Sequence, residues 1–244
     1  MKKLILLILI LLVTAAVLYH YFPRKTQTVM DYAKQTVRHE KHTVSSRLEQ
    51  FGESARSRLA PHFAAADIHL PPEAVRLLAF KDTEQLELYA RNADTEWRKV
   101  HTYPIQAASG HAGPKLREGD KQVPEGFYDI EAFNPNSRFH VSLRLNYPNP
   151  FDLAMAKAEQ RTEPGSDIMI HGKAVSVGCL AMGDTVAEEL FALTAWVGRE
   201  KVKVIIAPTD FRKTPDYRFE GEQPGWLPEL YKDIRAELAN YPLS

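Results

Sequence analysis

Residues 137–147 read Ser-Arg-Phe-His-Val-Ser-Leu-Arg-Leu-Asn-Tyr, the clearest alternation of polar and apolar side chains in the sequence. Because successive side chains of a strand point to opposite faces, this stretch predicts a strand with one buried and one accessible face. The apolar face carries Phe139, Val141, Leu143, Leu145 and Tyr147. The accessible face is unusually basic, since it carries Arg138, His140 and Arg144.

Similar short apolar runs lie on both sides of this strand, separated by charged turns or by turns that contain glycine and proline. We expect further strands at 74–80, 85–91, 97–105, 127–133, 167–171 and 201–207, and helices at 184–199 and 227–240. Residues 108–126 are rich in glycine and proline and predict a loop. Strands with segregated helices indicate an α+β fold, mostly β with attached helices.

Composition excludes several classes of protein. The chain has 244 residues, with 31 basic and 31 acidic side chains, so no global positive field attracts nucleic acid. Only 12 glycines and 16 prolines are present, which rules out a collagen-like or wholly disordered chain. The length suits one sizeable core with appendages.

The N-terminus carries a targeting segment. Lys2 and Lys3 precede an apolar and aromatic run over residues 4–22, which is nearly long enough to span a bilayer. A cleaved signal peptide begins in the same way, but no clean small-residue cleavage site is evident. We therefore expect residues 1–25 to be a transmembrane anchor or, alternatively, a removable signal. Either reading exports the body to the periplasm, and the anchor would hold it at the inner membrane.

Residues 26–70 are polar, with apolar residues recurring at helical spacing, and predict a helical spacer. A continuous helix over 26–60, ending before Pro61, would be about 50 Å long. The same stripe is also compatible with a helix folded down onto the body. The expected organisation is then 1–25 anchor or signal, 26–70 spacer, 71–215 catalytic domain and 216–244 C-terminal helical extension.

The chemistry is concentrated in residues 167–182, which read DIMIHGKAVSVGCLAM. Cys179 is the chain's one cysteine, so in an oxidising compartment it is either a buried apolar residue or a working thiol. A thiol needs a neighbouring base to become nucleophilic, and His171 is the nearest histidine in sequence. Gly178 would let a substrate approach, and the N–H groups of Gly178 and Cys179, at a turn before a helix, would stabilise an oxyanion.

This stretch resembles the signature of the L,D-transpeptidase (YkuD-domain) family, in which His-Gly, a spacer and Ser-x-Gly-Cys recur. Residues 107–128 and 134–149 are similar to the YafK-type branch. The resemblance implies a β-rich catalytic domain, a cysteine nucleophile and a peptidoglycan stem peptide containing meso-diaminopimelate as substrate. It makes Cys179 the nucleophile and His171 the base, oriented by a backbone carbonyl. Ser176, Gly172 and Gly178 take the supporting positions of the motif.

Two departures separate this chain from many family members. Val177 stands where many carry a second histidine, and the eight-residue step from His171 to Cys179 is short. Both departures fit the YafK-type branch. They leave open whether the acyl acceptor is an amine, as in transpeptidation, or water, as in hydrolysis that releases peptidoglycan-linked lipoprotein.

The remaining candidates are residues that would bind substrate. Arg138, His140 and Arg144 would hold substrate carboxylates if their strand face lines a cleft; otherwise that face is simply solvated. Tyr147 and Arg212 are candidates on the resemblance alone. The sequence contains no metal-ligand motif and no phosphate loop, so we expect neither metal nor cofactor. The alternative function is a non-catalytic peptidoglycan-binding module of the same fold.

Overall fold

The computed structural model describes residues 10–14 and 41–243. The chain divides into two units, Met1–Lys41 and His42–Ser244, and each is treated by itself. In the first unit, residues 10–14 are helical, and the rest of the predicted anchor and the first part of the predicted spacer lie outside the described residues. Within the described ranges, no helix is both long and apolar enough to cross a membrane.

The second unit is built on a mixed sheet of nine strands. Their order across the sheet is β3-β2-β1-β9-β5-β6-β7-β8-β4, and neighbours are antiparallel except for the pairs β1–β9 and β7–β8. The strands are β1 (Ala74–Phe80), β2 (Gln85–Arg91), β3 (Arg98–Pro104), β4 (Ala107–Ala108), β5 (Gly126–Asn134), β6 (Ser142–Leu145), β7 (Met169–His171), β8 (Leu180–Ala181) and β9 (Val202–Ala207). The helices are α3 (Val44–Ala65), α4 (Pro150–Ala158), α5 (Asp184–Val197) and α6 (Leu227–Leu238), with a short 3-10 turn, η1 (Arg199–Lys201). The predicted α+β class is confirmed.

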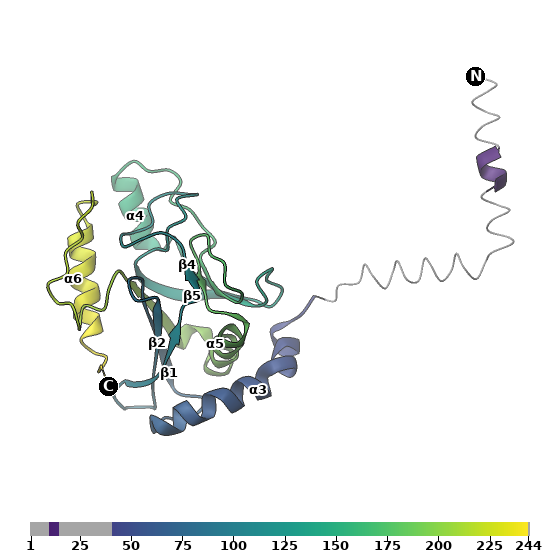
Figure 1. Cartoon of the computed structure of the whole chain (residues 1–244), viewed down its shortest axis with the longest axis horizontal. Coiled ribbons are helices and arrows are strands. Elements are labelled where there is room, and N and C mark those ends of the chain that lie inside the picture. Colours follow the sequence, from purple (N-terminus) through teal and green to yellow (C-terminus); the bar gives the residue numbers. More distant parts are fainter. Residues whose placement is uncertain (1–9, 15–40, 244) are drawn as a thin grey trace, which may run out of the picture. The chain divides into compact units, whose positions relative to one another are not determined.

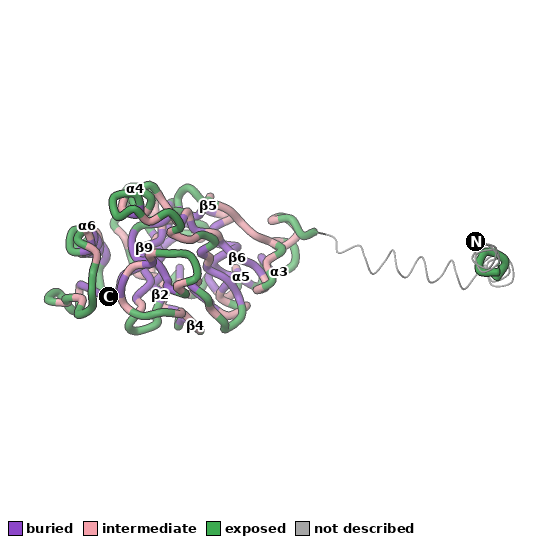
Figure 2. Tube along the Cα trace, turned by 90° about the horizontal axis from the view of Figure 1, so that it is seen from above, coloured by how far each residue is buried: buried purple, intermediate pink, exposed green. Residues whose placement is uncertain are grey.

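Helices cover both faces of the sheet and create two cores (Figure 1). On one face, α3 and α5 pack against Val75, Leu77 and other apolar residues of β1, β2, β5 and β9. On the opposite face, α6 packs against Leu78 and Ile205. Figure 2 shows the buried residues along the strands and α5, with exposed residues along the outer turns of α4 and α6. The sheet is therefore the layer that positions every other element.

Helix α3 follows the predicted apolar stripe but does not serve as a spacer over its described length. Phe51, Ala55, Leu59 and Phe63 are buried, and the Phe51 ring lies 6.0 Å from that of Phe191 on α5. Residues 44–65 therefore belong to the folded body, which corrects the predicted domain boundary at residue 71. The stripe alone could not decide this, because it describes an apolar face without naming what covers it.

The expected end of this helix at Pro61 is also wrong, since α3 continues to Ala65. A proline in a helix removes one N–H and leaves the carbonyl four residues earlier without its donor. That residue, Ser57, is exposed, as is Pro61 itself, so solvent can satisfy the carbonyl. Thr43 begins the helix by accepting a hydrogen bond from the Ser46 N–H.

Two further boundaries differ from expectation. Of the strand predicted over 137–147, only β6 is a strand in the structure. The chain turns at residues 137–141, where His140 has a φ of 76°. The buried face of Val141, Leu143, Leu145 and Tyr147 is nevertheless confirmed. The predicted C-terminal extension is part of the body, because α6 buries Leu227, Ile234 and Leu238 against the sheet. Helix α4 is an element that we did not predict.

Candidate active site

Strands β7 and β8 bring His171 and Cys179 together. They are parallel neighbours in which Ile170 pairs with Leu180 and His171 with Ala181. Cys179 directly precedes β8, two residues before Ala181, so it projects from the same sheet face as His171, one diagonal step away. The motif does not lead straight into a helix as expected: β8 and Gly183 intervene before α5 begins at Asp184.

His171 is held in one tautomer. Its Nδ1–H donates to the carbonyl oxygen of Gly172 at 2.6 Å, which identifies the backbone carbonyl that the family resemblance implied. The imidazole is 1% exposed and stacks on the Phe139 ring, with centroids 4.6 Å apart. Burial lowers the pKa of His171 below its ordinary value of 6.5, although the bond to Gly172 opposes the shift. With the proton on Nδ1, Nε2 carries a lone pair and can act as a base.

The surroundings of Cys179 favour its neutral thiol form. Burial raises the pKa of its thiol above the ordinary 9.0; the backbone N–H of Met169 and the Lys115 ammonium oppose this, and the Asp167 charge adds to it. Its Sγ lies 3.6 Å from the carbonyl oxygen of Asp167, and within the described residues it makes no hydrogen bond to His171. A thiol in such surroundings needs a base to become nucleophilic, and His171 Nε2 is the candidate base.

Two serine hydroxyls hold the turn that carries Cys179. The Cys179 N–H donates to Ser176 Oγ at 3.1 Å, and Ser176 Oγ donates to the Cys179 carbonyl at 2.7 Å. The Gly178 N–H donates to Ser109 Oγ at 2.6 Å. The two N–H groups that we expected to bind an oxyanion are thus engaged by hydroxyls in this structure. An oxyanion would need one of these hydroxyls to move aside.

Ser109 is a site residue that sequence reasoning missed. Its N–H donates to Ser176 Oγ at 3.2 Å, and its Oγ lies 3.2 Å from the same atom. The pairing of Ala108 in β4 with Leu180 in β8 brings it there from the predicted loop. No local pattern around residue 109 signals this role, because Ser109 and Gly178 lie 69 residues apart in sequence.

Both motif glycines are required by close packing. A Cβ on Gly172 would lie 2.5 Å from Asp184 Oδ1 and 2.7 Å from the Phe139 carbonyl oxygen. Gly178 has a φ of 93°, which side chains rarely adopt, and its Cβ would lie 3.3 Å from the Gln122 carbonyl oxygen. A larger residue at either position would therefore displace the loop beside the thiol.

The three basic residues of the accessible face do not form one cluster. Arg144 pairs with Glu131 and with Asp167, both at 2.9 Å, and Asp167 is the residue whose carbonyl touches Cys179. His140 Nε2 instead lies 2.9 Å from Glu188 on α5, and the Arg138 side chain is exposed. Arg144 is therefore the basic side chain that geometry connects to the thiol.

Tyr147 and Arg212, the candidates from the resemblance alone, are both bonded to other parts of the protein. Tyr147 is 3% exposed and its hydroxyl donates to the Pro164 carbonyl at 2.8 Å, so it holds two loops together. The Arg212 guanidinium is buried beside α6, where it binds Glu87 at 2.6 Å and Asp210 at 2.7 Å. An arginine can bind either a substrate carboxylate or a carboxylate of the protein itself. The fold shows that the carboxylates bound by Arg212 are those of Glu87 and Asp210.

The described residues, 10–14 and 41–243, contain no group of three or more His, Cys, Asp or Glu placed to hold a metal ion. The chemistry described above uses only the thiol, the imidazole and backbone or hydroxyl groups.

The family follows from this site and from comparison with known proteins. The model of the L,D-transpeptidase catalytic domain (YkuD) matches residues 75–206, more than half of the chain, and includes both His171 and Cys179. The chain belongs to the L,D-transpeptidase catalytic-domain family. It is similar to the Escherichia coli (strain K12) protein named "Putative L,D-transpeptidase YafK", with 34% identity over 145 residues. The alignment covers 57% of this chain and 55% of YafK, so the chain spans about half the length of the curated relatives it matches.

Similar solved structures include the helical cell shape determining protein Pgp2 from Campylobacter jejuni, at 19% identity and a TM-score of 0.45, covering 68% of this chain and 69% of that chain. Bd1075 from Bdellovibrio bacteriovorus is 20% identical with a TM-score of 0.41, covering 70% of this chain and 56% of that chain. Similarity at this level carries no argument about the activity of this chain.

Proposed function

We propose that this chain is a peptidoglycan-modifying enzyme that cleaves amide bonds at meso-diaminopimelate of stem peptides through a cysteine acyl-enzyme. The observation that carries the proposal is the parallel pairing of β7 with β8, which places the buried, Nδ1-protonated His171 beside the start of β8, where Cys179 directly precedes the strand. Family membership supports the substrate class.

The reaction has two halves. In the first, His171 Nε2 accepts the thiol proton while Cys179 Sγ attacks the amide carbonyl carbon, and the leaving amine then takes that proton as the C–N bond breaks. The product is a thioester between the substrate acyl group and Sγ. In the second half, an amine or water loses a proton to His171 and attacks the thioester, which regenerates the thiol.

The acceptor decides between transpeptidation and hydrolysis. Hydrolysis would include the release of lipoprotein linked to peptidoglycan, as the YafK-type motif suggests. Val177, where many family members carry a histidine, is 71% exposed and offers no base. Its identity favours an acceptor that His171 alone can activate.

The full chain, incubated with purified disaccharide-tetrapeptides and with lipoprotein-bearing sacculi, tests this proposal. Mass spectrometry should show a covalent acyl adduct on Cys179, followed by cross-linked, shortened or lipoprotein-free products. Ser57→Ala, an exposed change on α3, provides a matched control that should behave as wild type. Binding to sacculi without any adduct or product would support the non-catalytic module instead.

We further propose that residues 4–22 anchor the body at the periplasmic face of the inner membrane, because the apolar run follows Lys2 and Lys3. Carbonate washing of isolated membranes, followed by N-terminal sequencing, tests this. An intact N-terminus in the washed pellet supports the anchor. A soluble periplasmic protein that begins near residue 17 would identify a removable signal.

A further inference from the structure

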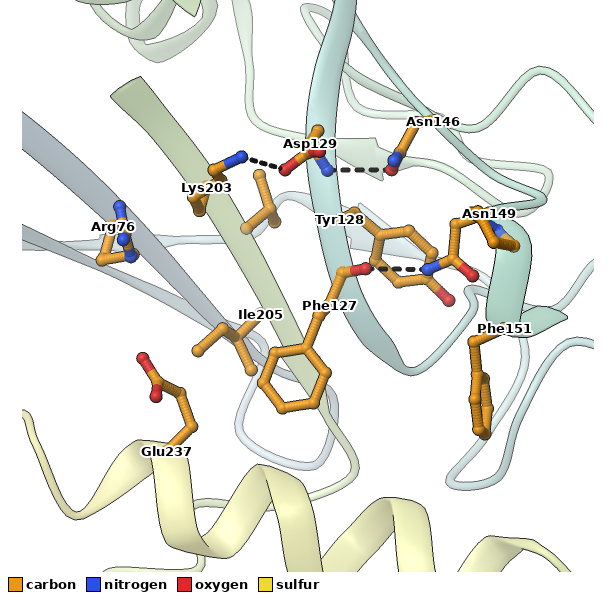
Figure 3. A pocket seen from close by; sticks show the side chains of 12 residues that line it. Arg76, Phe127, Tyr128, Asp129, Asn146, Asn149, Phe151, Lys203, Ile205 and Glu237 are labelled. Carbon is orange, nitrogen blue, oxygen red and sulfur yellow. Dashed lines mark hydrogen bonds and ion pairs between the residues drawn. The ribbon is translucent and has the colours of Figure 1, made fainter. Parts of the chain in front are cut away.

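A groove lies on the face of the sheet that α6 covers in part. It runs between α6 on one side and α4 on the other (Figure 3). It has a volume of about 450 Å³, and its floor is formed by β5 and β9. Phe127 of β5 and Phe151 of α4 project into it, and each ring is 38% exposed. The reaction described above uses none of these residues.

The groove is preformed, because its walls are bonded to one another. Lys203 Nζ donates to Asp129 at 2.7 Å, the Asp129 N–H donates to Asn146 at 2.8 Å, and Asn149 Nδ2 donates to the Phe127 carbonyl at 2.9 Å (Figure 3). The Phe151 ring is supported by Trp226, with ring centroids 5.6 Å apart at 85°. Binding of a ligand therefore requires little loss of conformational entropy in the protein.

The lining identifies the chemistry of the occupant. The partly exposed rings of Phe127 and Phe151 lie beside the side-chain amides of Asn146 and Asn149. The positive charges of Arg76 and Lys203 are balanced by the negative charges of Asp129 and Glu237. The negative faces of aromatic rings attract the weakly positive C–H groups of a saturated sugar ring. The Asn146 amide nitrogen, which has no hydrogen-bond partner among the described residues, can donate to hydroxyl and acetamido groups. A groove of balanced charge with these features suits an uncharged saccharide.

The groove is continuous with the catalytic face. Ile130 pairs with Leu145, so their neighbours Asp129 and Arg144 project from the opposite side of the sheet. Met169 and His171 project from that side too, because they pair with Arg144 and Ser142. Asn146 lines the groove two residues beyond Arg144, and Met169 lies beside Cys179 across β7 and β8. Asn146 and Cys179 are thus separated by two strand spacings and by two residues along a strand, which together amount to roughly 12 Å. A peptide of about three or four extended residues spans that distance.

We propose that this groove binds the glycan from which the stem peptide hangs, while the peptide reaches along β6 to Cys179. This inference rests on the proposed peptidoglycan substrate and adds a glycan subsite to it. The glycan contact would make sugar-linked stem peptides better substrates than free peptides.

Binding is tested with chitotetraose as the probe, by isothermal titration and by amide NMR of the full chain. We expect weak binding that perturbs residues 127 and 151, with the affinity reduced about tenfold by Phe127→Ala and by Phe151→Ala. The control is Leu153→Ala, which removes a 50% exposed apolar side chain of α4 outside the groove and should leave binding unchanged. Thermal unfolding verifies each variant, and Phe151→Ala decides alone if Phe127→Ala does not fold.

Kinetics provide the second readout. Phe151→Ala should raise KM for a disaccharide-linked tetrapeptide about tenfold and leave turnover of the free tetrapeptide unchanged. Chitotetraose binding without turnover of either substrate would leave the groove standing and reject the proposed function. Absence of chitotetraose binding, or a wild-type dimer that Phe151→Ala converts to monomer, would overturn the glycan subsite.

Discussion

The cluster around Cys179 and the cluster around Arg212 use similar polar chemistry but differ in what surrounds them. Cys179 is partly exposed, and its neighbours leave His171 Nε2 without a protein partner among the described residues. The Arg212 side chain is 7% exposed, and Glu87, Asp210 and the Tyr89 hydroxyl occupy its donors. Polar groups whose hydrogen bonds are all made within the protein stabilise the fold. Polar groups that keep an unused hydrogen-bonding atom near solvent can react with a substrate.

The strongest test of this contrast is Cys179→Ala. Removing the nucleophile should abolish turnover of a defined muropeptide, by at least a thousandfold, and leave the thermal midpoint within a degree or two because the thiol makes one weak hydrogen bond. Single-turnover mass spectrometry and calorimetry measure both effects. Turnover above a trace would show that the reaction does not pass through this thiol.

Arg212→Ala should produce the opposite result. It leaves the buried carboxylates of Glu87 and Asp210 without their main partner, which typically costs about 3–5 kcal/mol of unfolding free energy. The rate constant per folded molecule should be unchanged. Urea unfolding measures the loss, and Arg218→Ala, at an exposed arginine, is the matched control. A fall in kcat at full stability would return Arg212 to the list of substrate contacts.

The two clusters should also respond to acid at different pH values. Burial lowers the pKa of His171, so the acid limb of the pH–rate profile should lie below 6.5, where activity falls up to tenfold per pH unit. Burial alone would raise the pKa of Glu87 and Asp210, but hydrogen bonds from Lys99 and Arg212 to Glu87, and from Arg212 to Asp210, lower both.

The sign of the stability change follows from those lowered pKa values. The unfolded chain binds these protons more tightly, so the cluster's stabilisation is complete above pH 4.5 and is lost as pH falls through the folded pKa values. Unfolding measured from pH 7 to 3 should show this loss in wild type and much less of it in Arg212→Ala. Identical slopes in the two proteins would mean that the cluster is not the origin of the acid sensitivity.

The smallest expected effect is that of Ser109→Ala. The change leaves the Gly178 N–H without its acceptor and removes one neighbour of Ser176, so we expect kcat to fall about tenfold with KM little changed. Steady-state kinetics and the rate of Cys179 alkylation both report on the turn. A rise in kcat would show instead that the Ser109 hydroxyl obstructs oxyanion binding.

Local sequence proposed His171 and Cys179 as the catalytic pair, because both lie in one short motif. It did not predict β8, whose parallel pairing with β7 sets their relative position. It predicted the limits of β1 and β2 from short apolar runs between charged turns, and the buried face of β6 from alternation, which directly encodes which side chains are covered. It could not predict Ser109, which reaches Gly178 only through the pairing of β4 with β8. Nor could it separate Arg212 from Arg144, since both are arginines whose partners lie far away in sequence.

What the sequence determined by itself is therefore the class of fold and the motif that makes Cys179 and His171 the proposed nucleophile and base, since periodicity and motif spacing are local properties. Tertiary structure decided that α3 and α6 belong to the body, that two serine hydroxyls occupy the turn beside the thiol, and that Arg212 pairs with Glu87 and Asp210. The physical reason is that burial and hydrogen-bond satisfaction depend on elements that meet only after folding. An apolar stripe must be covered and a buried basic side chain must find an anionic partner. Only the folded chain shows which residues cover the one and pair with the other.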